Sequence, residues 1–190
     1  MSWNVVRFEQ AVPAPWKNGG GVTRELVTWP EPANWLWRMS VAEVSRSGPF
    51  SIFNGVQRWF AVLSGAGVRL ALGSQKYTLT ATSDPLCFDG AVVTQCELVD
   101  GATQDFNLMI RQPTVNAKMT RVSQSLDLEL TSSKVLAIYS IDSKAFLRFN
   151  NEVFDTEPAS LVWRTVCAGD RLQGHSTSAL LIQIFEGKSQ

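Results

Sequence analysis

Short strand-forming segments recur along the whole chain, and this rhythm constrains the fold more than any other feature. Runs rich in β-branched and aromatic residues alternate with turns of Gly, Pro, Asn, Asp and Ser. No amphipathic helical pattern of about ten residues or more interrupts them. Many short strands at roughly 8–12-residue spacing predict an all-β sandwich or barrel. The expected strands are residues 3–8, 22–29, 35–44, 58–63, 68–72, 77–80, 86–90, 92–99, 105–111, 118–123, 126–131, 135–141, 145–149, 161–166 and 179–185.

The 190 residues form two halves with a similar spacing of strands. Pro113 begins the second series, so we expect a tandem arrangement of one β unit, with residues 1–112 in the first half and 113–190 in the second. Within the first half, the glycines of the segment 64–67 predict a hairpin that joins strand 58–63 to strand 68–72.

Composition excludes several classes of function. Lys plus Arg equals Asp plus Glu at 17 each, so there is no basic excess for nucleic acid. No apolar run approaches the roughly 18 residues of a membrane span, and the N-terminus lacks the apolar region of a signal peptide. The three cysteines are odd in number and lack C-x-x-C spacing, which indicates reduced, mostly buried thiols in a cytoplasmic protein (Cys87, Cys96 and Cys167).

Neither metal nor nucleophilic chemistry has a recognisable signature. His175 is the only histidine and is expected in a loop, and no Cys or carboxylate cluster has ligand spacing. There is no G-x-S-x-G, and no cysteine has a nearby candidate base.

A run of three glycines, residues 19–21, lies beside Lys17 and Asn18. Glycine is favoured where the backbone needs a positive φ or a close approach. The run predicts either a loop that brings backbone N–H groups and Lys17 to an anion or a flexible turn between two strands.

Polar side chains alternate with apolar ones on the strands. Asp105, Asn107, Met109 and Arg111 share one face of their strand, which is either a pocket wall or a solvated surface. Arg38 and Ser40 form a similar pair between Trp37, Met39 and Val41, and Arg58 enters an apolar run. An arginine in such surroundings either extends to water or faces a polar cavity.

Seven short motifs resemble one known family, and they follow in order over roughly residues 13–111. The family is the HutD/Ves family of bicupins, and the second half of the chain resembles it only in strand rhythm. The motifs are Trp16-Lys17-Asn18-Gly19-Gly20-Gly21-x-Thr23-Arg24-Glu25, Trp37-Arg38-x-Ser40, Gly48-Pro49-Phe50-Ser51, Gly55-x-x-Arg58, Leu63-x-Gly65-x-Gly67, Phe88-x-Gly90 and Asp105-Phe106-Asn107-x-Met109-x-Arg111.

The resemblance implies two cupin β-barrels in one chain, with strands exchanged between them. Metal-binding cupins carry two histidines and a glutamate in a segment like 51–65. Here Arg58 falls about where the glutamate would be, and Ser51 to Asn54 occupy the histidine region, so neither a metal nor a cofactor is expected. The family member in histidine-utilisation operons is thought to bind a small carboxylate, formylglutamate, and to moderate flux or regulation. The Ves branch is associated with stress and cold response, and the triple glycine resembles the histidine-utilisation pattern more closely.

We therefore expect a metal-free bicupin that binds a small anionic metabolite in its N-terminal barrel. Arginines would bind the ligand's carboxylates, Lys17 and the glycine backbone would close the mouth, and Asp105 would orient one arginine. Two alternatives stay open: a cofactor-free isomerase or hydrolase with Glu43, Asp89 or Asp105 as general base, and a non-catalytic interaction scaffold. A homodimer stays open as well, because exposed Trp residues would mark an interface. The expected ligand-binding residues are Lys17, Asn18, Arg38, Ser40, Arg58, Phe88, Asp105, Asn107, Met109 and Arg111, with Trp16 as an apolar wall.

Overall fold

The computed structural model describes residues 2–187 and confirms the expected all-β fold. Nineteen strands and one short 3-10 helix, η1 (Phe8–Gln10), make up the regular structure of these residues. They form two compact units, one of residues 11–115 and one of residues 2–10 with 116–187. Each unit holds two antiparallel sheets.

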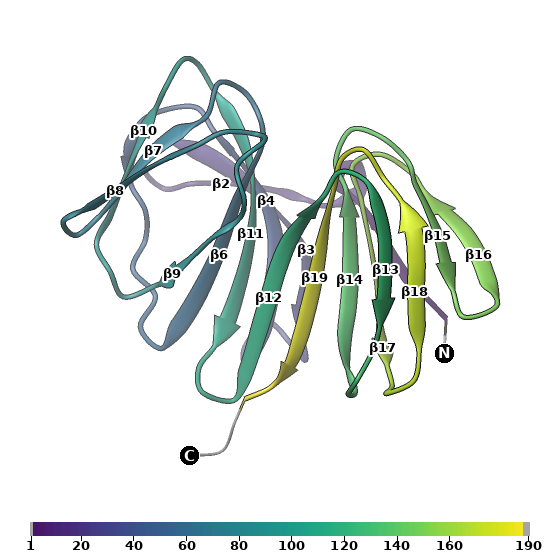
Figure 1. Cartoon of the computed structure of the whole chain (residues 1–190). Helices are drawn as coiled ribbons and strands as arrows, with labels where there is room; N and C mark the ends of the chain where they lie inside the picture. Colours follow the sequence, from purple (N-terminus) through teal and green to yellow (C-terminus); the bar gives the residue numbers. More distant parts are fainter. Residues whose placement is uncertain (1, 188–190) are drawn as a thin grey trace. The chain divides into compact units, whose positions relative to one another are not determined.

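In the unit of residues 11–115, a six-stranded sheet faces a four-stranded one. Figure 1 shows β7, β8 and β10 on one side of this unit and β4, β6 and β11 on the other. The buried core between them includes Phe60, Leu70 and Cys96. The six-stranded order is β2 (Pro13–Pro15), β3 (Gly21–Trp29), β4 (Trp37–Val44), β11 (Thr103–Arg111), β6 (Val56–Ser64) and β9 (Leu86–Asp89). The four-stranded order is β5 (Gly48–Pro49), β10 (Thr94–Leu98), β7 (Val68–Leu72) and β8 (Gln75–Leu79).

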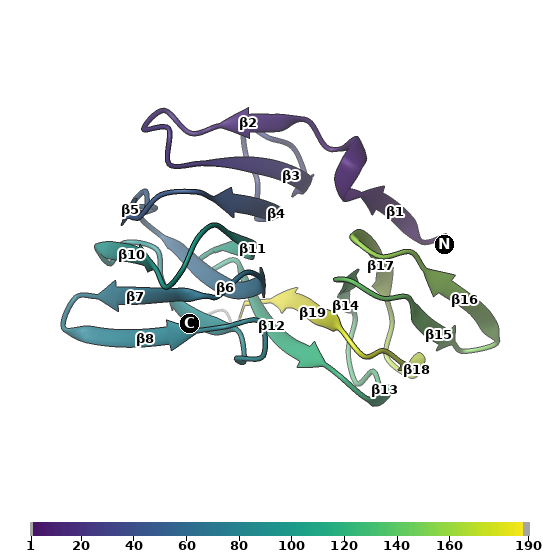
Figure 2. The ribbon, with the colours of Figure 1, turned by 90° about the horizontal axis from the view of Figure 1, so that it is seen from above.

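The other unit has the same two-sheet plan. Its core packs Ile138 and Leu181 of one sheet with Leu147 and Leu172 of the other. The five-stranded order is β1 (Asn4–Arg7), β17 (Ser160–Val166), β14 (Lys134–Ser140), β19 (Ala179–Glu186) and β12 (Val115–Val122). The four-stranded order, visible in Figure 2, is β13 (Ser125–Glu129), β18 (Arg171–His175), β15 (Ala145–Phe149) and β16 (Glu152–Thr156).

The first strand of the chain belongs to the sheet of the C-terminal unit. β1 pairs antiparallel with β17, from Asn4 opposite Trp163 to Arg7 opposite Ser160. Residues 2–10 therefore lie with residues 116–187, whereas the sequence analysis placed them in the first half.

The hairpin expected between strands 58–63 and 68–72 is wrong. β6 pairs with β11 and β9, whereas β7 pairs with β10 and β8 in the other sheet. Between β6 and β7 the chain passes from one sheet to the other, and the turn requires glycine because Gly65 and Gly67 have φ of 91° and 104°. A Cβ at either position would meet a backbone carbonyl oxygen, 2.5 Å from that of Ala102 or 2.3 Å from that of Leu79.

Two further expectations need correction. His175 ends β18 and does not lie in a loop, because it pairs with Ser125 and Phe146 across the sheet. Of the three free thiols only Cys96 is buried, while Cys87 and Cys167 are exposed. Among the described residues, no helix is long and apolar enough to span a membrane.

Candidate functional site

A cavity of about 670 Å³ opens in the unit of residues 11–115. Its walls come from β2 and the glycine loop after it, from β3, β4, β6 and β11, and from the segment 49–53. The volume lies within the roughly 300–1,000 Å³ range of small-molecule sites. The cavity is therefore large enough for a metabolite.

Strand register places the cavity's polar residues in two rows across the six-stranded sheet. In one row, Met109 of β11 lies opposite Arg38 of β4 on one side and opposite Arg58 of β6 on the other. In the next row, Asn107 of β11 lies opposite Ser40 of β4. Neighbouring strands are about 4.8 Å apart, so the backbones of the two arginines lie roughly 10 Å apart with Met109 between them. Both arginines line the cavity.

Arg58 is a buried cation to which residues 2–187 supply no counter-ion. It is 6% exposed, and no ion pair found among residues 2–187 includes it. Its Nη2 donates to Asn107 Oδ1 at 2.8 Å, while its buried Nε has no partner. Three phenyl rings lie 5.1 to 5.8 Å from its Cζ, those of Phe50, Phe53 and Phe88. Burial, and next the positive charge of Arg38, lower the pKa of Arg58 from 12.5 to about 10.

Arg38 is less buried and has a carboxylate neighbour. Its Nη1 lies 3.7 Å from Glu25 Oε2, a carboxylate that also lines the cavity and is about half exposed. Its Nη2 contacts Met109 Sδ at 3.2 Å, and its buried Nε has no partner. The Phe53 ring lies 5.9 Å from its Cζ, so both cavity arginines approach the same phenyl ring.

The glycine run forms an ordered turn held against the end of β4. Gly19 has φ of 66°, and a Cβ on Gly21 would lie 2.5 Å from Glu43 O. The N–H of Gly19 donates to Trp16 O, and that of Gly20 donates to Asn18 Oδ1. These two amides are therefore engaged within the loop and are not presented to an anion. The loop contributes the side chains of Lys17 and Asn18 to the cavity, and the Trp16 ring is fixed by a 2.7 Å bond from Nε1 to Thr23 Oγ1.

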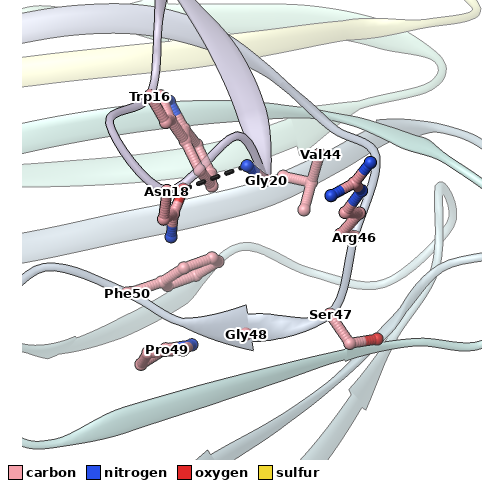
Figure 3. A pocket seen from close by; sticks show the side chains of 9 residues that line it. All are labelled: Trp16, Asn18, Gly20, Val44, Arg46, Ser47, Gly48, Pro49 and Phe50. Atoms are coloured by element: carbon pink, nitrogen blue, oxygen red, sulfur yellow. Dashed lines mark hydrogen bonds between the residues drawn. The ribbon is translucent and has the colours of Figure 1, made fainter.

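A second, smaller pocket of about 220 Å³ adjoins the cavity and is shown in Figure 3. Five of its nine lining residues also line the cavity, namely Trp16, Asn18, Val44, Pro49 and Phe50. The remaining four are Gly20, Arg46, Ser47 and Gly48. The two spaces thus share one wall.

Seven of the ten residues expected at the site line the cavity, and three do not. Asp105 is fully buried beside Thr103, and no bond from its carboxylate to an arginine is found in the described part of the chain, so the expected orienting role is not supported. Phe88 lies under Arg58 and outside the cavity wall. Arg111, at the exposed end of β11, donates from Nε to Trp35 O and stacks on the Trp35 ring, so it turns away from the cavity. The seven are Lys17, Asn18, Arg38, Ser40, Arg58, Asn107 and Met109.

Three further residues line the cavity and were not predicted from the sequence, namely Glu25, Phe50 and Phe53. Thr23 and Glu25 are two residues apart on β3 and therefore lie on the same face of the strand. This spacing could have predicted that both line the cavity. Phe53 lies in an irregular segment, where no periodicity assigns a direction to its side chain. The candidate bases Glu43, Asp89 and Asp105 lie outside the cavity lining, in which Glu25 supplies the carboxylate.

Residues 2–187 contain no group of three or more His, Cys, Asp or Glu side chains that could hold a metal ion. The side chains of Arg58, Arg38 and Lys17 line the cavity and supply donor groups for an anion.

The fold is of the cupin type, with two open sheets in each unit. It is shared with an oxalate decarboxylase from Lactobacillus farciminis at a TM-score of 0.64 and 9% identity, over 96% of this chain and 86% of that one. The chain belongs to the HutD family, whose model matches residues 9–182.

The solved HutD structure from Pseudomonas fluorescens has a TM-score of 0.85 and 26% identity, and the match covers 98% of this chain and 100% of that chain. A Pseudomonas putida protein described as an uncharacterised 21.2 kDa protein in the hutC 3' region is 36% identical over 64% of this chain. Protein Ves from Cronobacter sakazakii is 33% identical over 55% of this chain. The chain spans 65% and 58% of the length of these two curated relatives.

Proposed function

We propose that the protein binds a small acidic metabolite in the cavity without a metal ion, and that a ligand carboxylate lies against Arg58 and Arg38. The observation that carries this proposal is the buried Arg58 guanidinium, which lines the cavity and has no counter-ion among residues 2–187. Burying an unpaired cation is costly, and a carboxylate accepting charge-assisted hydrogen bonds offsets that cost. Ser40 and Asn107 orient the ligand from the neighbouring row.

Formylglutamate is the candidate ligand, and moderation of histidine utilisation in the cytoplasm is the proposed role. Two comparisons support the proposed role. One relative is named for the hutC 3' region, and a solved structure that matches 98% of this chain is named HutD. The Ves relatives make a role in the stress response the alternative.

Isothermal titration with formylglutamate, glutamate and urocanate tests the proposal. We expect heat of binding with at least one of the three and a lower affinity at high salt, because the contact is between charges. Absence of binding by all three, with unchanged thermal stability at millimolar ligand, would reject it.

Glu25 is expected to compete with the ligand for Arg38. Because its carboxylate is 3.7 Å from Arg38 Nη1 and half exposed, the pair contributes about 0.7 kcal/mol or less. Glu25→Gln should therefore raise the affinity for a monocarboxylate about threefold. The matched control is Glu43→Gln, an exposed acid outside the cavity lining, for which titration should give the wild-type affinity. A weaker affinity in Glu25→Gln would instead assign Glu25 a direct contact with the ligand.

A further inference from the structure

The small pocket beside the cavity carries polar groups that the proposed carboxylate site does not use. Figure 3 shows Asn18 and Phe50 on one side of it and Arg46 and Ser47 on the other. The Asn18 side chain is fixed because its Oδ1 accepts the Gly20 N–H at 3.0 Å. This bond leaves the Nδ2 donors of Asn18 available on the pocket side of the loop, because in Figure 3 they point away from Gly20.

Arg46 adds to the small pocket a cation that does not line the larger cavity. Its backbone is held at the glycine loop, where its N–H and that of Ser45 donate to Gly20 O at 3.2 and 2.9 Å. Its guanidinium is in none of the ion pairs found in the described part of the chain. The backbone is thus anchored, while Arg46 is an exposed residue of the pocket lining that has no carboxylate partner among residues 2–187.

The two spaces are adjacent, and the side chains that line them carry more positive charge than one carboxylate can neutralise. Trp16 and Phe50 line both, with their rings edge to face and 6.3 Å between centroids. A ligand that extends from one space to the other runs along these rings. The combined lining has one acid, Glu25, and four cations, Lys17, Arg38, Arg46 and Arg58.

We infer that the small pocket is a second anion subsite, in which Arg46 and Asn18 bind an acidic group at the far end of an elongated ligand. This inference rests on the proposed function, since the first carboxylate is the one that Arg58 and Arg38 bind. The ligand class is an unbranched or lightly substituted dianion, with an apolar middle segment along Trp16 and Phe50. Arg46 is accordingly a specificity-determining residue that selects dianions over monoanions.

The test compares straight-chain dicarboxylates from malonate to suberate with monocarboxylates of the same length, by isothermal titration of the full chain. We expect one chain length at which the dicarboxylate binds about tenfold more tightly than its monocarboxylate, as one added charge-assisted contact provides. Arg46→Gln should remove this advantage and leave monocarboxylate affinity within about twofold of wild type, and Arg46→Lys should restore part of it. The matched control is Arg69→Gln, an exposed arginine of β7 outside both linings, which should preserve the advantage.

The outcomes separate this inference from the proposed function. Monocarboxylate binding that depends on Arg58, with no advantage for any dicarboxylate or with an advantage that survives in Arg46→Gln, would overturn the second subsite alone. Failure of every mono- and dicarboxylate to bind would reject the proposed function and the second subsite together.

Discussion

Replacement of Arg58 by methionine is expected to abolish carboxylate binding while stabilising the free protein. Truncating one partner of a buried charge pair costs about 2–5 kcal/mol, so ligand affinity should fall about 30-fold or more. In the free protein Arg58 is 6% exposed, and within the described part of the chain it has no counter-ion and no partner for its Nε. A methionine of similar length removes this buried charge and packs against the surrounding phenyl rings.

One loss opposes the gain in stability. Asn107 Oδ1 accepts from Arg58 Nη2 at 2.8 Å, and it would be left without this donor, at a cost of about 1 kcal/mol. Replacing buried ionic groups by apolar ones can stabilise by about 1–4 kcal/mol, so the net effect should be a gain on the order of 1 kcal/mol. A functional residue whose removal stabilises the fold is expected where a cavity is built to receive a charge.

Titration and urea unfolding of Arg58→Met measure the two effects separately. Arg111→Ala is the matched control, because this arginine is exposed and contacts Trp35 outside the cavity. The carboxylate affinity of this variant should stay within about twofold of wild type. Full carboxylate affinity in Arg58→Met, or equal losses in both variants, would remove Arg58 from the site.

Period-two alternation predicted which residues share a face, and this is why seven of the ten residues expected from the sequence line one cavity. Arg38 and Ser40 line the cavity while Trp37 and Met39 are buried away from it, as their alternation indicated. The same rule failed for Arg111. Alternation assigns a face but not the point at which a cavity ends, and Arg111 lies beyond that point, at the exposed end of β11.

Sheet order could not be predicted from local patterns. Arg38 and Arg58 approach the same ligand space because β11 lies between β4 and β6, a pairing of segments about 50 to 70 residues apart in the chain. The misassigned hairpin between β6 and β7 has the same origin, since a glycine turn allows both a hairpin and a crossing between sheets. The β1 strand likewise finds its partner β17 more than 150 residues away, and its own sequence carries no signal for that partner.

Asp105 should make the protein lose stability as the pH rises from about 4 to 7. The carboxyl group is fully buried on β11, where Oδ2 accepts from Thr103 Oγ1 at 3.1 Å and Oδ1 has no partner. Burial raises the pKa of Asp105 from 3.8 to about 7, although the Thr103 bond lowers it in part. The thiol of Cys96 lies close enough that the Asp105 charge contributes, after burial, to a Cys96 pKa of about 12.

The sign follows from the two states of the carboxyl group. Below pH 3.8 it is protonated in both the folded and the unfolded chain and has no effect on their balance. Between pH 3.8 and about 7 the unfolded chain releases the proton while the folded chain retains it, so the free energy of unfolding falls by about 1.4 kcal/mol per pH unit. Above pH 7 both states are ionised, and the accumulated loss stays constant at about 4 kcal/mol.

Asp105→Asn should remove this dependence, because an amide of the same shape does not titrate. Urea unfolding at pH 4, 6 and 8 should show a variant close to wild type at pH 4 and more stable by up to about 4 kcal/mol at pH 8. Asp127→Asn is the control, since Arg171 and Gln173 hold the pKa of the exposed Asp127 at about 2 and its titration lies below this range. If the difference between Asp105→Asn and wild type is the same at pH 4 and pH 8, the pKa of Asp105 is not raised in the folded protein, and this prediction is wrong.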